Sequence, residues 1–120
     1  MTTQVSNDML GNDAREFVIA LRGPAANGTY PVMLNPPFTF DILRADFQCD
    51  TGTIKAKFTI DGTDVEFDGG DETLELSNTA DSENVASAGS VGVGDTLLMV
   101  LFDALDSPVL VAIDLFCRRT

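Results

Sequence analysis

The sequence predicts an all-β fold, an antiparallel β-sandwich of jelly-roll type with about eight strands and a flexible N-terminal arm. Short segments alternate apolar and polar side chains at a period of two, which is typical of half-buried strands. Gly, Pro, Asn and Asp separate these segments at intervals of about 8–12 residues. In addition, no apolar stripe with helical spacing continues beyond about two turns.

The first 14 residues are small and polar, and Gly11-Asn12 marks a break within them. We expect an arm over residues 1–14 and one sandwich domain over residues 15–120. The arm is either a frayed end or an anchor that orders on a partner, with Val5, Met9 and Leu10 as its apolar side chains.

Two strands are expected next. Phe17, Ile19 and Leu21 share one face of the first, which ends before Gly23-Pro24. The second strand contains Tyr30, Val32 and Leu34. It includes Pro31, which indicates an edge strand or a position whose backbone nitrogen faces solvent.

The segment from Phe38 to Cys49 alternates throughout but changes phase in its middle. Phe38, Phe40 and Ile42 follow one phase, and Leu43, Ala45, Phe47 and Cys49 follow the other. This change predicts a β-bulge or a strand that crosses between two sheets.

The clearest alternation runs from Ile54 to Ile60, with lysines and threonine on the polar face. Asp61-Gly62 follows and predicts a type I′ hairpin turn. The returning strand carries Val65 and Phe67, and a further short strand carries Leu74 and Leu76. Residues 77–90 contain few large side chains, so we expect a long surface loop with at most a weak strand near Val85.

The last two strands, near 96–102 and 109–117, are apolar at almost every position. A two-sheet sandwich buries only one face of each sheet, so a second apolar face predicts a partner surface, most simply another copy of the chain. Cover by the long loop and the N-terminal arm is the alternative. The expected interface residues are Val5, Met9, Leu10, Leu98, Val100, Phe102, Leu110 and Phe116.

Composition excludes several classes of function. Seven basic and 19 acidic residues give a net charge of −12, which opposes binding to nucleic acid or to anionic membranes. Histidine, the commonest general base and metal ligand, is absent. We therefore expect no nucleic-acid partner, no membrane partner and no cofactor.

The acidic segment 64–75 partly follows the spacing of an EF-hand calcium loop. It departs from that pattern at Glu66 and Asp71, and it follows a strand where an EF-hand needs a helix. We expect an acidic hairpin without a metal.

The sequence gives little support for a glycosidase site. Asp103, Asp106 and Asp114 could pair as glycosidase carboxylates, but the chain lacks tryptophan and has one tyrosine to hold a sugar ring.

The two cysteines and the glycine-rich run also have simple structural explanations. Cys49 and Cys117 have no histidine to activate them, and we expect two buried thiols, although a bridge between strand ends stays open. The glycine-rich run 89–94 leads into a strand, so we expect a flexible loop. The sequence therefore predicts a protein that is not an enzyme.

Four short segments occur in a characteristic order and spacing: Gly28–Leu34 (GTYPVML), Pro37–Ile42 (PFTFDI), Phe58–Thr63 (FTIDGT) and Val93–Leu97 (VGDTL). An apolar final strand that ends in Arg118-Arg119-Thr120 follows them. Together, over residues 16–120, these features resemble a group of small phage virion proteins with a β-sandwich fold.

The resemblance implies a non-enzymatic virion protein, foremost a capsid decoration or cement protein or a head fibre. It implies other virion proteins as partners, the major capsid protein first among them, and a homo-oligomer, with a trimer as the first expectation. The alternative is a receptor- or glycan-binding module of a tail fibre or tail tip, which exposed aromatic side chains in a loop would favour.

Overall fold

The computed structural model describes residues 1–6 and 15–120, whose regular secondary structure is entirely β-strand. The strands are β1 (Thr2–Ser6), β2 (Glu16–Pro24), β3 (Gly28–Leu34), β4 (Phe40–Cys49), β5 (Thr53–Ile60), β6 (Thr63–Asp64), β7 (Glu66–Phe67), β8 (Leu74–Leu76), β9 (Asp81–Ser87), β10 (Ser90–Val91), β11 (Thr96–Leu105) and β12 (Leu110–Arg119).

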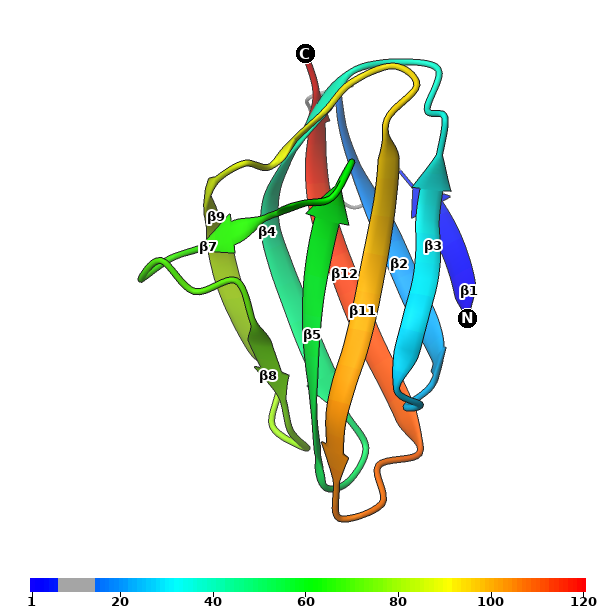
Figure 1. The fold of residues 1–120 in the computed structure, drawn as a ribbon, viewed down its shortest axis with the longest axis vertical. Helices are drawn as coiled ribbons and strands as arrows, with labels where there is room; N and C mark the ends of the chain where they lie inside the picture. Colours follow the sequence, from blue (N-terminus) through cyan, green and yellow to red (C-terminus); the bar gives the residue numbers. More distant parts are fainter. Residues whose placement is uncertain (7–14) are drawn as a thin grey trace.

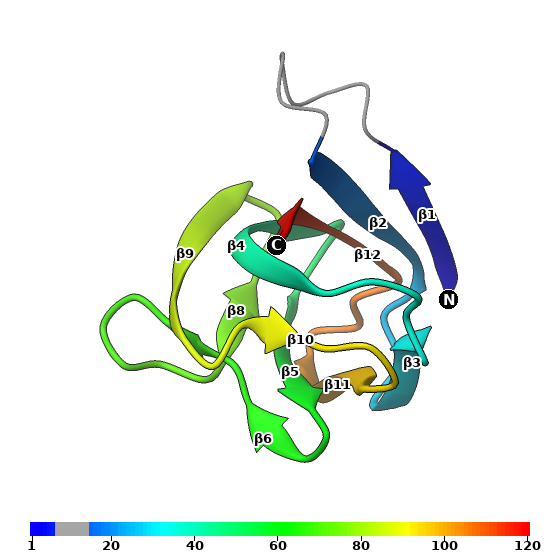
Figure 2. The same cartoon turned by 90° about the horizontal axis from the view of Figure 1, so that it is seen from above.

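These strands form two antiparallel sheets that pack face to face (Figures 1 and 2). The first sheet has the order β1-β2-β12-β4-β9-β7, with β10 beside β4. The second has the order β3-β11-β5-β6, with β8 beside β5. We call them the β12 sheet and the β11 sheet after their central strands.

The topology is that of a jelly roll. Strands β2, β12, β4 and β9 of one sheet face β3, β11, β5 and β8 of the other, and the chain crosses repeatedly between the sheets. Eight strands arranged in this way form two Greek keys closed into a sandwich. The predicted fold class is therefore confirmed, and β1 is an addition beside β2 that the eight-stranded jelly roll does not require.

Alternation places the core between the sheets. In β5, Ile54, Ala56 and Phe58 are fully buried, while Lys55 and Lys57 point outward. The strands β11 and β12 bury alternate residues in the same way. The fully buried large side chains include Phe17, Phe40, Phe58, Phe67, Ile19, Leu21, Ile54, Leu74, Leu76, Leu97, Met99 and Leu101.

The phase change in β4 is a β-bulge. Phe116 of β12 pairs with Arg44, whereas the next residue, Cys117, pairs with Ile42, so Leu43 is left without a counterpart. Leu43 is consequently exposed, although the alternation had assigned it to the inward phase. The extra residue lets both halves of β4 keep their apolar side chains in the core.

The predicted type I′ turn and the predicted edge strand are also confirmed. Asp61 and Gly62 both have positive φ, 49° and 84°, as a type I′ turn requires, and they join β5 to β6. The strand that contains Pro31 is β3, which lies at the edge of the β11 sheet.

The structure differs from expectation in two segments. The expected surface loop 77–90, with at most a weak strand near Val85, contains the seven-residue strand β9, which includes Val85 and pairs with β4 from Arg44 to Phe47. Of the expected arm, Thr2–Ser6 form a strand paired with β2 rather than a flexible end. Backbone pairing with β2 and β4 holds the two segments, and their mostly polar side chains give no regular apolar alternation.

The remaining arm positions, including Met9 and Leu10, lie outside the described residues. Within the part of the chain that the structure describes, no helix is long and apolar enough to cross a membrane.

Candidate interaction surfaces

The outward face of the β11 sheet carries an apolar stripe on β11, formed by Leu98, Val100 and Phe102 and called here the β11 stripe. All three side chains are half-buried. They lie opposite Thr59, Lys57 and Lys55 of β5, respectively. The aliphatic stems of lysines readily cover apolar neighbours while their charged ends stay in water.

Those two lysines are the only ones in the chain, and acidic side chains neutralise both. Lys57 Nζ lies 3.7 Å from Asp64 Oδ1, and Lys55 Nζ lies 3.6 Å from Asp103 Oδ2. The β11 stripe is thus an apolar strip beside paired charges, on a molecule that is otherwise strongly acidic.

Phe116 lies on the opposite side of the sandwich, on the outward face of the β12 sheet. The Arg44 guanidinium covers it, with Cζ 4.1 Å from the ring centroid. Val18, its neighbour on β2, is only 5% exposed. Arg44 Nε also donates a hydrogen bond to Asp46 Oδ1 at 3.1 Å. This second apolar surface is therefore largely covered by the chain's own side chains.

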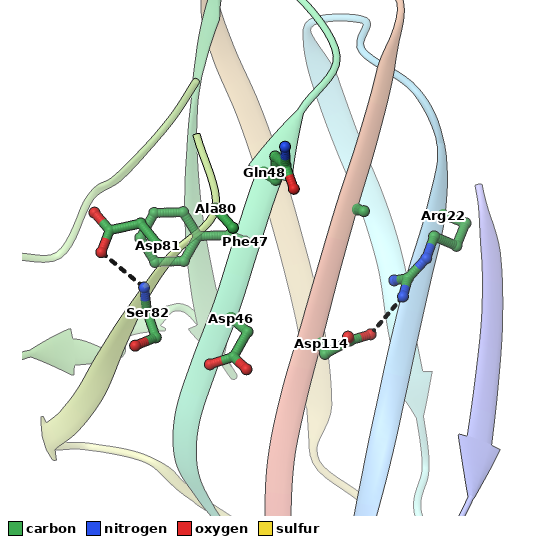
Figure 3. A pocket seen from close by; sticks show the side chains of 9 residues that line it. Arg22, Asp46, Phe47, Gln48, Ala80, Asp81, Ser82 and Asp114 are labelled. Carbon is green, nitrogen blue, oxygen red and sulfur yellow. Dashed lines mark hydrogen bonds and ion pairs between the residues drawn. The ribbon is translucent and has the colours of Figure 1, made fainter. Parts of the chain in front are cut away.

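A shallow groove of about 500 Å³ lies on the same face and extends from β2 across β12 and β4 to the start of β9 (Figure 3). Asp46 and Asp114 lie opposite each other on β4 and β12. Arg22 Nη2 reaches Asp114 Oδ1 at 2.9 Å, as the dashed line in Figure 3 shows. The aromatic residue of the groove, Phe47, is 4% exposed, so the groove offers charged and amide groups rather than a ring surface.

One end of the sandwich exposes aliphatic side chains on the β11–β12 connection. Leu105, Val109 and Leu110 are each more than half exposed. Asp50 of the β4–β5 turn holds this connection, because its Oδ1 accepts hydrogen bonds from the backbone nitrogens of Val109 and Leu110, both at 3.0 Å. These bonds and the bond to Thr51 lower the pKa of Asp50.

The flank of the sandwich formed by β7, β8 and β9, on the side away from β1 and β3, is acidic. Glu83 lies among the carboxylates of Asp71, Asp81 and Asp68, and its Oε2 is buried without a hydrogen-bond partner. Desolvation, followed by repulsion from these neighbours, raises the pKa of Glu83.

The 64–75 segment consists of short strands and turns. Among the described residues, no group of three or more acidic or cysteine side chains is arranged to hold a metal ion.

Both cysteines are free and buried on the inward face. Cys49 pairs with Val111 near the start of β12, whereas Cys117 lies near its end, so the two thiols are far apart along that strand. Burial raises the pKa of both thiols, with a further contribution from Asp50 at Cys49. They behave as small apolar residues of the core, as the sequence indicated.

The predicted interface residues do not form one patch. The β11 stripe lies on one outward face and Phe116 on the other, while Leu110 lies at one end and Val5 on edge strand β1. The sequence placed Val109 in the double-faced apolar strand but did not name it as an interface residue, and it did not single out Leu105. Both flank Asp106-Ser107-Pro108, a turn signal at the surface that was the available indication of their exposure.

No protein-family model matches this sequence, and the search of curated proteins found no match. Among solved structures, the chain is similar to one in the acidic stable capsid structure of Helicobacter pylori bacteriophage KHP30. The identity is 11%, the TM-score is 0.54, and the match covers 98% of this chain and 93% of the other. This similarity supports the fold assignment.

Two further structures have lower TM-scores. The CBM22-1 xylan-binding domain of Xyn10C from Paenibacillus barcinonensis is 14% identical over 98% of this chain and 80% of that chain, with a TM-score of 0.38. A glycoside hydrolase family 43 arabinoxylan arabinofuranohydrolase from Bacillus subtilis is 15% identical over 98% of this chain and 24% of that chain, with a TM-score of 0.40. At these scores neither carries an argument about this chain.

Proposed function

We propose that this chain is a non-enzymatic structural protein of a phage virion, carried on the head as a decoration or cement protein or as a head fibre. The observation that carries the proposal is the similarity of its jelly roll to a phage capsid chain along almost the full length of both. Jelly rolls recur in viral capsids, so the shared fold supports the proposal by analogy. Features of the molecular surface support it further.

The charged groups of the groove support a role without catalysis. Asp114 is engaged by Arg22, and Asp46 is engaged by Arg44. Glycoside hydrolysis uses a pair of carboxyl groups, one of which delivers a proton to the leaving group. Two carboxylates that each form an ion pair with arginine suit a stable surface better than proton delivery.

The alternative, a receptor- or glycan-binding module, has less support from the surface. All nine aromatic residues lie within 15–120, and none of them is fully exposed. Sugar rings commonly stack on exposed aromatic faces, and the groove in Figure 3 offers none. This observation favours the structural role.

The proposed attachment surfaces are the β11 stripe and the segment 1–14, and the proposed partner is the major capsid protein. At a net charge of −12, broad basic attraction is not available to this protein, so local apolar contacts are the proposed means of attachment. The β11 stripe is apolar and its neighbouring charges are paired, which makes it the outward sheet face best suited to such a contact.

Particle labelling tests the proposal. Antibodies raised against the chain should label the heads of purified virions of the phage that encodes it, and quantitative mass spectrometry should find it in many copies per particle. Label confined to tail tips would favour the receptor-binding alternative. Absence of the chain from purified particles would contradict the proposed function.

Truncation and substitution then separate the two attachment surfaces. Particles from a deletion mutant that lacks the chain are incubated with full-length protein, with protein lacking residues 1–14, or with a Val100→Lys variant. Loss of binding only in the truncated protein shows that segment 1–14, which includes β1, is required for attachment. Loss only in Val100→Lys identifies the β11 stripe.

A further inference from the structure

Strand β1 extends the β12 sheet beyond the area that the β11 sheet covers. Val5 pairs with Ile19, and Ile19 is fully buried in the core. The side chain of Val5 therefore points to the inward side of the sheet, yet it is 50% exposed. In Figures 1 and 2, β1 lies at the outer margin of the sandwich, beside β2. The eight-stranded jelly roll is complete without this strand. Met1, directly before it, packs against the core, whereas Val5 stays half exposed.

The other sheet edges have features that oppose the addition of a further strand. Strand β3 contains Pro31 and a register shift against β11, while β6 and β7 are two residues long and β8 is three. Prolines, irregularities and short edge strands are common protections against edge-to-edge pairing. Strand β1 contains no proline, is five residues long, and pairs with β2 in continuous register from Thr2 to Ser6. Among the described residues, no strand occupies its other edge.

Charge separates the two flanks of the molecule. Thr2–Ser6 and the whole of 23–40, which includes β3, contain no charged side chain. In contrast, residues 58–117 contain 13 acidic residues and no lysine or arginine. The flank formed by β1 and β3 is thus neutral, while the flank formed by β7, β8 and β9 is acidic (Figure 1). Two copies of a protein at −12 repel each other least when their neutral flanks meet.

We propose that two copies of this chain pair through their β1 strands, antiparallel and across a two-fold axis. Such a contact is isologous, so each residue meets its counterpart in the reversed strand. Full overlap of the five residues places Gln4 opposite the partner's Gln4 and Thr3 opposite the partner's Val5. The two β12 sheets then form one continuous sheet, and the contact reduces the exposure of both Val5 side chains.

The contact is small, which sets the expected strength. One strand of five residues adds few hydrogen bonds and buries little area, so we expect a weak or transient dimer that forms only at high protein concentration. The inference does not depend on the virion role, and it specifies a dimer where the family resemblance implied a trimer.

The self-opposed position of Gln4 allows a direct test by charge. Gln4→Glu and Gln4→Lys each place like charges opposite each other across the two-fold axis, so each variant alone should be a monomer. An equimolar mixture should again form a dimer, because the opposed charges then attract. Sedimentation measures the mass, which for the dimer is twice the chain mass of 12.8 kDa.

Gln48→Glu is the matched control. It makes the same change on the same sheet, but Gln48 lies on β4, three strands away from β1. This variant should associate as the unchanged protein does. The Gln4 variants should keep the unfolding midpoint of the unchanged protein within a few degrees, because β1 lies outside the eight-stranded jelly roll. Gln48→Glu removes the hydrogen bond that Gln48 Nε2 donates to the carbonyl oxygen of Asn78 at 2.8 Å, so association is compared at a temperature where each variant is folded.

A disulfide cross-link tests the register independently. Opposed residues of an antiparallel pair have Cα atoms about 4.5–5.5 Å apart, within the range that a disulfide bridges. Under mild oxidation, Gln4→Cys should give a band of twice the chain mass on a non-reducing gel, whereas Gln48→Cys should not. The native thiols do not compete, because Cys49 and Cys117 are buried.

Several results would overturn the proposal. They are a monomer for the unchanged protein even at high concentration, a trimer, a Gln4→Glu protein that still forms the dimer, or a mixture of the two Gln4 variants that stays monomeric.

Discussion

Asp50 and Leu110 exchange two hydrogen bonds although they lie 60 positions apart in the sequence. The backbone nitrogen of Leu110 donates to Asp50 Oδ1 at 3.0 Å, and the backbone nitrogen of Asp50 donates to the carbonyl oxygen of Leu110 at 3.2 Å. The same Oδ1 accepts a bond from the nitrogen of Val109. This exchange ties the β4–β5 turn to the start of β12, at the lower end of the sandwich in Figure 1.

We expect Asp50→Asn to lower the unfolding midpoint by several degrees at neutral pH. The pKa of Asp50 is lowered in the folded protein, so its ionised form stabilises the fold above the unfolded pKa of about 3.9. This contribution is lost as the pH falls through the folded pKa. The difference between the two proteins should therefore be largest above about pH 5 and shrink in more acidic buffer. Thermal melts followed by circular dichroism across this range provide the measurement.

Asp106→Asn is the control for that experiment. Asp106 lies on the same β11–β12 connection, is exposed, and has a positive φ of 59° that asparagine also tolerates. It should change the midpoint little. An equal loss in both variants would show that the hydrogen bonds of Asp50 are not the cause.

Gly52→Ala should destabilise the protein more than Gly62→Ala. Both glycines have positive φ, 63° and 84°, so both substitutions carry a conformational cost of about 1–2 kcal/mol. A Cβ atom at Gly52 would lie 2.3 Å from the carbonyl oxygen of Leu105, whereas one at Gly62 would meet nothing within 4 Å. Urea unfolding of the two variants measures the loss of stability in each, and the difference between them reports the clash at Gly52. Equal losses would contradict the close packing of the β4–β5 turn against the β11–β12 connection.

Two neighbouring residues of β11 should lose very different amounts of stability when they are truncated to alanine. Met99 is fully buried between the sheets, so Met99→Ala should cost about 2–5 kcal/mol. Val100 is half-buried on the outward face, and Val100→Ala should cost less than about 1 kcal/mol. Chemical denaturation measures both values. A large loss at Val100 in the isolated protein would show that the β11 stripe is part of the core and not a contact surface.

Glu83→Gln should stabilise the protein at neutral pH. Because the pKa of Glu83 is raised in the folded state, its ionised form destabilises the fold above the folded pKa, and this cost disappears as the pH falls and the carboxyl is protonated. The gain in unfolding midpoint should therefore be present at pH 7 and absent in acid. Melts at the two pH values provide the comparison.

Glu72→Gln is the matched control, since it removes the same charge from an exposed residue of the same acidic flank. If Glu72→Gln gave the same gain, the effect would come from net charge alone. A loss of stability in Glu83→Gln would contradict the buried, unpartnered position of its Oε2.

The sequence by itself determined the strands that contribute to the core. In β5, Ile54 to Ile60 could be assigned because alternate side chains enter one continuous apolar layer, which leaves a period of two in the residues themselves. The turn at Asp61-Gly62 was predictable because few residue types adopt its positive φ, and the edge position of β3 was predictable because Pro31 has no backbone N–H to donate. The irregularity of β4 was visible as a change of phase in the alternation, and the structure decided that it is a bulge and not a crossing between sheets.

Only the tertiary structure decided where the polar strands and the outward apolar side chains lie. Strands β1 and β9 form because β2 and β4 offer them backbone hydrogen-bonding groups, and such pairing needs no apolar residues in the added strand. Likewise, Leu98 and Phe116 both lie on double-faced apolar strands, yet sheet pairing places them on opposite outer faces of the molecule. Periodicity indicates which residues share a face of one strand, whereas the packing of the two sheets determines where that face points.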